Sequence, residues 1–228
     1  MFELFKNPSE FFRKKVSEPE ELKRPFCIIV SLWLARMFML STILVLLMTN
    51  SSSKFSTEFT PITSDMYVFF LVILLMVLIF SFIGTLFLWI TTAGVFYLFS
   101  ALFRGKGSFK RVLAFTSYGF IPYIIDIITS PLYFWVIIQK VDFFSMIETL
   151  DQNGDISVFI NELLYANLPL NIISTLFSIL LFILALYIWI NGIKYGRNLS
   201  TKKAILTVGI PAVLYVIYKI FMLMLYFI

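Results

Sequence analysis

Residues 67–103 read YVFFLVILLMVLIFSFIGTLFLWITTAGVFYLFSALF, without a single charged side chain. An α-helix over these residues would measure about 55 Å, whereas the hydrocarbon core of a bilayer is about 30 Å thick. No polar turn interrupts the stretch around Gly84 or Gly94. The stretch therefore predicts one long, tilted membrane helix whose last residues project along or beyond the cytoplasmic face.

The composition of the whole chain indicates the same class of protein. Of 228 residues, 60% are hydrophobic and only 14% are charged, against about 45–50% and about 25% in a typical soluble domain. We expect an all-α, polytopic membrane protein, a five-span helical bundle behind a short interfacial head over residues 1–25. The expected spans cover residues 26–48, 67–103, 112–138, 168–193 and 204–228 of a membrane domain over residues 26–228.

The lysines and arginines predict the orientation of these spans, because they collect on cytoplasmic flanks. They are concentrated in the head and in the turns 104–111 and 194–203, whereas the two remaining loops carry only Lys54 and Lys140. We therefore expect a cytoplasmic N-terminus and an outside C-terminus. The cell membrane is the expected location, or an internal membrane such as the ER or Golgi in a eukaryote. The net charge of +5 follows this distribution and does not predict nucleic-acid binding.

The head has the pattern of a short amphipathic helix. Asn7 can cap a helix that begins at Pro8, with Glu10 as its capping-box partner. Phe11 and Phe12 give the helix an apolar side, and three basic residues would face anionic lipid headgroups: Arg13, Lys14 and Lys15. We predict a helix lying on the inner leaflet, with a docking site for a cytosolic partner as the alternative.

The outer loop over residues 139–166 predicts two amphipathic helices joined by a polar turn. The turn resembles a calcium-binding EF-hand loop in its ligand spacing, with four candidate ligands: Asp151, Asn153, Asp155 and Glu162. However, Ile156 stands where such a loop requires glycine. We therefore interpret Asp155 as a helix cap and predict no metal site.

Three ionisable residues fall inside the expected spans: Arg36, Asp126 and Lys219. Asp126 and Lys219 both lie about 22 Å from the cytoplasmic ends of their spans, so they can pair, and Arg36 is the next candidate partner. One interpretation is a polar clasp that fixes helix packing. The other is a polar path for a small solute or ion, next to the helix bends expected at Pro122 and Pro131.

The turn Gly105-Lys106-Gly107-Ser108 offers backbone amides beside several cations. One interpretation is a site for an anionic lipid headgroup, made by Arg104, Lys106, Ser108, Lys110 and Arg111. The other is an ordinary basic turn on the cytoplasmic side.

The sequence gives no support for catalysis. The chain has no histidine, which excludes serine–histidine and cysteine–histidine mechanisms. Aspartyl proteolysis within the membrane needs two acids, and the spans offer only Asp126. We therefore predict a non-enzymatic protein without a cofactor.

Three motifs carry a resemblance to a known family: Asn7-Pro8-Ser9-Glu10-Phe11-Phe12, Phe103-Arg104-Gly105-Lys106-Gly107-Ser108-Phe109 and Ser117-Tyr118-Gly119-Phe120-Ile121-Pro122. The chain resembles the Yip-domain family, the Ypt/Rab-interacting membrane proteins, and most of all its compact prokaryotic members. Gly105, Gly107, Tyr118 and Pro122 are the matching motif residues.

The resemblance implies a membrane scaffold or adaptor that organises lipids or partner proteins. Anionic lipids, a membrane-protein partner or a second copy of the chain are the expected partners. Eukaryotic members bind prenylated small GTPases. This chain lacks their long cytosolic arm and their Asp-Leu-Tyr-Gly-Pro stretch, and has Glu18-Pro19-Glu20-Glu21-Leu22 before the first span. Small GTPase binding is therefore not predicted.

Overall fold

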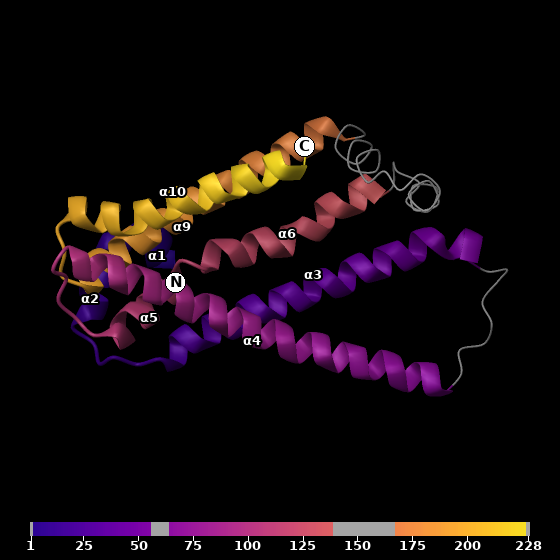
Figure 1. The fold of residues 1–228 in the computed structure, drawn as a ribbon, viewed down its shortest axis with the longest axis horizontal. Coiled ribbons are helices and arrows are strands. Elements are labelled where there is room, and N and C mark those ends of the chain that lie inside the picture. Colours follow the sequence, from indigo (N-terminus) through magenta and orange to yellow (C-terminus); the bar gives the residue numbers. More distant parts are fainter. Residues whose placement is uncertain (1, 56–63, 139–166, 227–228) are drawn as a thin grey trace. The chain divides into compact units, whose positions relative to one another are not determined.

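The computed structural model describes residues 2–55, 64–138 and 167–226, which form helices and the short turns between them, without a strand (Figure 1). The head contains α1 (Phe2–Lys6) and α2 (Pro8–Val16). The longer elements are α3 (Lys23–Phe55), α4 (Ser64–Leu102), α5 (Phe109–Tyr118), α6 (Ile121–Ile138), α9 (Leu168–Gly196) and α10 (Thr201–Tyr226). Within the described ranges, five segments are long and apolar enough to cross a membrane, which confirms the predicted all-α, multi-pass class.

Helix α4 confirms that the long apolar stretch forms one helix. Its 39 residues give a length of about 58 Å. The buried positions follow each other at helical spacing: Thr85, Trp89, Ala93, Phe96 and Ser100. Large apolar side chains on the other faces of α4 are exposed, as expected of a helix that packs on protein along one stripe and meets lipid elsewhere.

The third expected span is divided rather than continuous. Helix α5 ends at Tyr118, and Gly119 and Phe120 separate it from α6. The N–H of Gly119 donates to the Thr116 carbonyl at 3.2 Å, in a tightened last turn. Pro122 stands at the second position of α6 and has no N–H to offer the preceding helix. The interruption therefore lies just before Pro122 and not at the proline itself.

Pro131, by contrast, stays inside α6. A proline inside a helix leaves the carbonyl four residues earlier without its usual donor. Here that carbonyl belongs to Ile127, and the hydroxyl of Ser130 donates to it at 2.8 Å. This substitution of a side-chain donor allows a proline within a membrane helix.

The chain divides into two compact units: residues 1–32, 83–123 and 182–228 form one, and residues 33–82 and 124–181 form the other. In the first unit, α5 is the core, because nearly all of its residues from Val112 onward are buried. In the second unit, Trp33 of α3 joins α4: its indole N–H donates to the Ser81 hydroxyl at 3.0 Å, and its ring lies 5.2 Å from that of Phe82.

Candidate functional site

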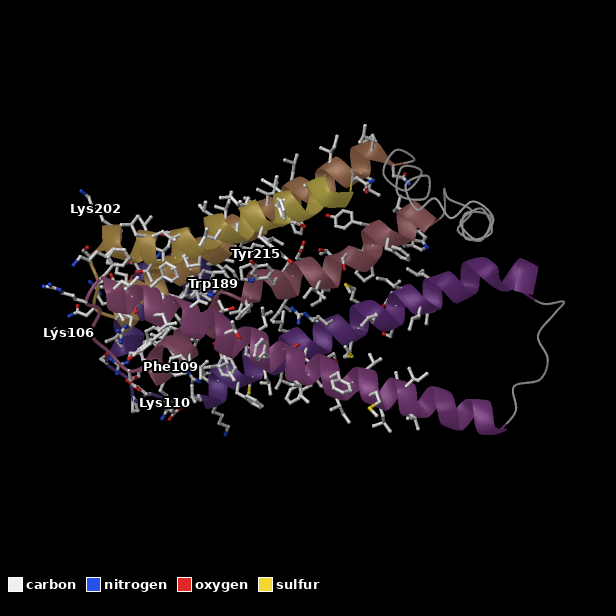
Figure 2. All side chains as sticks on the ribbon, in the orientation of Figure 1. Lys106, Phe109, Lys110, Trp189, Lys202 and Tyr215 are labelled. Carbon is white, nitrogen blue, oxygen red and sulfur yellow. The ribbon has the colours of Figure 1, made fainter. Side chains whose placement is uncertain are left out.

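The polar features of the first unit gather where its helices begin and end. We use the term basic end for residues 2–25, 103–111 and 197–203. Three exposed lysines at this end, Lys106, Lys110 and Lys202, point away from the helices (Figure 2).

Arg197, directly after α9, holds the basic end together. It is only 3% exposed. Its Nε donates to the Ser100 hydroxyl at 2.8 Å, Nη2 donates to the Gly105 carbonyl at 2.7 Å, and Nη1 donates to the Gly107 carbonyl. The guanidinium lies 4.2 Å from the centre of the Tyr97 ring. Neutral acceptors and an aromatic face therefore stabilise this buried cation and join α9 to the end of α4.

The two glycines of the turn 103–108 make this close approach feasible. Gly107 has a φ of +138°, and a Cβ there would lie 2.3 Å from the Gly196 carbonyl oxygen. A Cβ on Gly105 would lie 2.9 Å from the Ser100 carbonyl oxygen and 3.2 Å from Nε of Arg197. The carbonyl groups of Gly105 and Gly107 both accept hydrogen bonds from Arg197 of the same chain. The turn therefore has a structural role whether or not it also binds a lipid.

The N-terminal helix α2 packs on protein through its aromatic side. Asn7 caps it as predicted, with its side chain accepting from the Glu10 N–H at 3.2 Å. Phe12 is fully buried, and its ring lies 5.0 Å from that of Phe115. Ser9 and Tyr195 share a hydroxyl–hydroxyl bond of 2.6 Å. Phe12, on the apolar side predicted to lie on the membrane, is thus part of the protein core, because it packs on Phe115 and Tyr118 of α5 and beside Gly192 of α9.

Ser108 and Arg111, two members of the predicted headgroup site, contact an anion of the chain itself. Ser108 caps α5 by accepting from the Arg111 N–H at 3.1 Å, and its hydroxyl donates to a Glu20 carboxylate oxygen at 2.6 Å. Nε of Arg111 lies 3.1 Å from the other Glu20 oxygen. Arg104, Lys106 and Lys110 are exposed. The lipid headgroup site stays a prediction. Two of its five residues, Ser108 and Arg111, already bind the Glu20 carboxylate.

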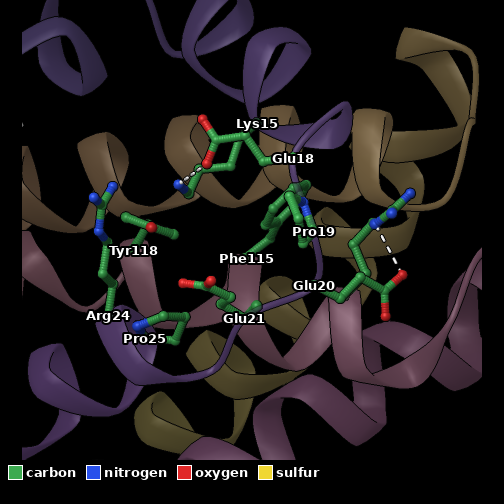
Figure 3. Close-up of a pocket in the computed structure, with 11 residues that line it drawn as sticks. Lys15, Glu18, Pro19, Glu20, Glu21, Arg24, Pro25, Phe115 and Tyr118 are labelled. Carbon is green, nitrogen blue, oxygen red and sulfur yellow. Dashed lines mark hydrogen bonds and ion pairs between the residues drawn. The ribbon is translucent and has the colours of Figure 1, made fainter.

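A cavity of about 210 Å³ lies between the segment that leads into α3 and the buried helix α5 (Figure 3). Phe115 and Tyr118 contribute aromatic rings to its wall. Pro19 and Pro25 contribute further apolar surface. The charged lining consists of Lys15, Glu18, Glu20, Glu21, Arg24 and Arg111. The cavity therefore combines an apolar wall with equal numbers of acidic and basic groups.

Ion pairs on the head shift two ionisation equilibria. Hydrogen bonds to Glu3 (2.7 Å) and Glu10 (3.1 Å) raise the pKa of Lys14. The hydrogen bond from Lys15 (2.8 Å) lowers the pKa of the Glu18 carboxyl. In both cases the ion pair favours the charged form of the group.

The motif residues Tyr118 and Pro122 are both buried beside the interruption between α5 and α6. The Tyr118 ring lies 5.2 Å from that of Phe11, so the head and the third span meet at this residue. Two residues earlier, the Thr116 carbonyl accepts from the indole N–H of Trp189 at 2.7 Å. These contacts give the motif a structural role.

Of the three ionisable residues inside the spans, the structure describes the side chains of Asp126 and Arg36 but not that of Lys219. The Asp126 carboxylate accepts from the Ser178 hydroxyl at 2.8 Å, which links α6 to α9. Arg36 is half-buried on α3. The side chain of Lys219 lies outside the described residues, so its pairing with Asp126 stays a prediction. The candidate calcium ligands Asp151, Asn153, Asp155 and Glu162 also lie outside the described residues, together with the predicted outer helices.

Sequence reasoning missed Arg197, Trp189 and Glu20 as organising residues. By sequence, Arg197 is one of four cations in the turn 194–203, and nothing in its neighbours marks it as buried. A signal was available for Trp189, because a tryptophan late in an apolar span needs a partner for its N–H. Glu20 gave the weakest signal, since its partners lie 88 or more residues away.

Comparison with known proteins agrees with the resemblance. The profile of the Yip1 domain matches residues 2–223. An uncharacterized protein of Methanocaldococcus jannaschii is 33% identical over 137 residues, which cover 60% of this chain and 89% of that protein. No solved structure matches the chain.

Proposed function

This chain belongs to the Yip1 domain family and is a multi-pass membrane protein, and we propose that it acts as a scaffold or adaptor without catalytic activity. In this role, the basic end faces the cytoplasm and gathers anionic lipids or a partner membrane protein. The observation that carries the proposal is the preassembled packing of the basic end around Arg197.

Preassembly favours binding because the binding surface is ordered before the partner arrives. The head is fixed by the burial of Phe12 and the bond between Ser9 and Tyr195. The two basic turns are fixed by the three hydrogen bonds of the Arg197 guanidinium. Binding to a surface that is already ordered costs less conformational entropy than binding to a loop that must first become ordered.

The exposed cations indicate what the surface binds. Arg104, Lys106 and Lys110 form no ion pair with any residue that the structure describes. Each such cation near an anionic membrane surface contributes about 1 kcal/mol of attraction. Anionic headgroups, or an acidic segment of a partner that lies along the membrane, fit this surface.

The alternative is transport of a small solute or ion past Arg36, Asp126 and Lys219. Two observations favour the scaffold. The Asp126 carboxylate is already bonded to Ser178 across two spans, as a packing clasp requires. The cavity of about 210 Å³ is lined by residues of the basic end and of α5, and neither Arg36 nor Asp126 belongs to it.

Two measurements on the full-length protein separate the two functions. In sealed vesicles, a panel of ions and small solutes should cross no faster than through empty vesicles. In native membranes, a photo-crosslinking residue at Lys106 should give a discrete protein or lipid adduct, whereas one at the exposed apolar position Phe87 should give only bulk lipid. Flux that the Asp126→Asn variant abolishes would refute the scaffold and establish transport.

A further inference from the structure

The charges that line the cavity between residues 15–25 and α5 are mostly paired with each other. Lys15 lies 2.8 Å from Glu18, and Arg111 lies 3.1 Å from Glu20, so each of these pairs is electrically neutral (Figure 3). Two lining charges remain, Glu21 and Arg24. Among the residues that the structure describes, the side chains of these two have neither an ion-pair partner nor a hydrogen-bond partner, although Arg24 is close enough to Glu18 to help lower the pKa of that carboxyl.

The cavity thus presents one negative and one positive group to a ligand, beside apolar surface. A simple anion would be attracted by Arg24 and repelled by Glu21, and a simple cation the reverse. A ligand that carries both charges on neighbouring groups satisfies both residues. The nearly buried rings of Phe115 and Tyr118 (4% and 3% exposed) supply the apolar wall.

The position of the cavity indicates where this ligand comes from. Arg24 and Pro25 belong to the first turn of α3, where the first candidate span begins. Arg111 belongs to the first turn of α5, where the third candidate span begins. A cavity between the starts of two spans lies at the level of phospholipid headgroups.

We propose that this cavity binds the headgroup of a zwitterionic phospholipid with a primary ammonium, whose phosphate contacts Arg24 and whose ammonium contacts Glu21. The inference rests on the proposed function and names one lipid class that the scaffold gathers. The ammonium N–H groups donate hydrogen bonds to the Glu21 carboxylate, which a trimethylammonium group cannot do. Phosphatidylethanolamine has this chemistry.

Native mass spectrometry of the full-length protein measures lipid binding directly. Short-chain phosphatidylethanolamine, phosphatidylcholine and phosphatidylglycerol are titrated separately. We expect phosphatidylethanolamine to bind about three- to fivefold more tightly than the other two, because partly exposed ion pairs contribute little each. Free phosphoethanolamine should not compete at equal concentration, since it lacks the acyl chains that place the headgroup; equal competition would show a soluble ligand and overturn the lipid assignment.

Matched variants test the two residues. Arg24→Gln should weaken the binding of all three lipids, because each carries the phosphate that Arg24 contacts, and Glu21→Gln should remove the preference for phosphatidylethanolamine. As controls, Lys23→Gln removes a positive charge and Glu3→Gln a negative charge from exposed positions outside the cavity. Both variants should keep the lipid affinity and the preference of the unmodified protein. Equal effects of Arg24→Gln and Lys23→Gln, or equal binding of phosphatidylcholine by the unmodified protein, would overturn the proposal. If the crosslink at Lys106 still forms without this lipid preference, the inference fails and the scaffold proposal stands.

Discussion

The indole nitrogen of Trp189 would lie 2.0 Å from a Cβ atom built on Gly119, so the two residues are in direct contact only because Gly119 has no side chain. The same indole N–H donates to the Thr116 carbonyl one turn earlier. Trp189 therefore stabilises the last turn of α5 and at the same time requires glycine at the interruption. This contact accounts for the glycine between Tyr118 and Pro122 in the motif.

Gly119→Ala should destabilise the protein. The added methyl group displaces Trp189 from the Thr116 carbonyl, and overpacking of this kind typically lowers the free energy of unfolding by about 1–3 kcal/mol. The melting temperature in detergent is the measurement. Gly94→Ala is the matched control, because nothing lies within 4 Å of its added Cβ, and a helical alanine should leave stability equal or higher. Equal melting temperatures for the two variants would contradict the contact.

Arg197 should tolerate neither methionine nor lysine. Each change breaks the three hydrogen bonds of the guanidinium fork, and buried bonds to a charged group contribute about 1.5–3 kcal/mol each. We expect both variants to lower the free energy of unfolding by at least about 2 kcal/mol. Lys202→Met, at an exposed position, should change it by less than about 0.5 kcal/mol. Full stability of Arg197→Lys would show that charge alone suffices.

The salt bridge of Glu18 should make the stability of the head depend on pH. Because the pKa of Glu18 is lowered below its ordinary value of 4.5, its contribution is present above pH 4.5 and disappears as the pH falls through the lowered value. The melting temperature of Glu18→Gln should lie slightly below that of the unmodified protein at pH 7 and coincide with it at low pH. A difference that persists at low pH would indicate packing rather than charge.

The predicted orientation can be tested with single cysteines in a Cys27→Ser background. An impermeant thiol reagent should not label Lys106→Cys or Asn198→Cys from outside, although both positions are exposed at the basic end. It should label Phe55→Cys and Gln152→Cys. Labelling at position 106 from outside would invert the orientation and remove the basis for a cytoplasmic basic end.

A double-mutant cycle tests the predicted pair of Asp126 and Lys219. Asp126→Asn and Lys219→Met should each destabilise the protein, and the double variant should recover much of the loss. Losing one partner of a buried pair costs about 3–5 kcal/mol in soluble proteins, and the membrane value is reduced by snorkelling. Strictly additive losses would mean that Asp126 does not pair with Lys219, and Arg36 would then be the next candidate partner, beside the bond of Asp126 to Ser178.

Properties that depend on local pattern could be predicted from the sequence. An apolar run without a polar turn is enough to specify α4, and the capping pattern of Asn7 is enough to start α2. The interruption at Gly119 could not be predicted, because its cause includes a tryptophan 70 residues later in the chain. The same holds for Arg197, whose acceptors on Ser100, Gly105 and Gly107 lie at least 90 residues away. Charge counting treats every arginine as solvated, and burial depends on tertiary partners.

The docking of the N-terminal head has a consequence for biosynthesis. Ser9 bonds to Tyr195, a partner 186 residues later, and Phe12 packs close to Gly192 of the same helix. A ribosome releases the head long before it makes α9, so these contacts cannot form while the first spans enter the membrane. Residues of the head are thus translated well before α9 and reach their final position only after α9 has been made.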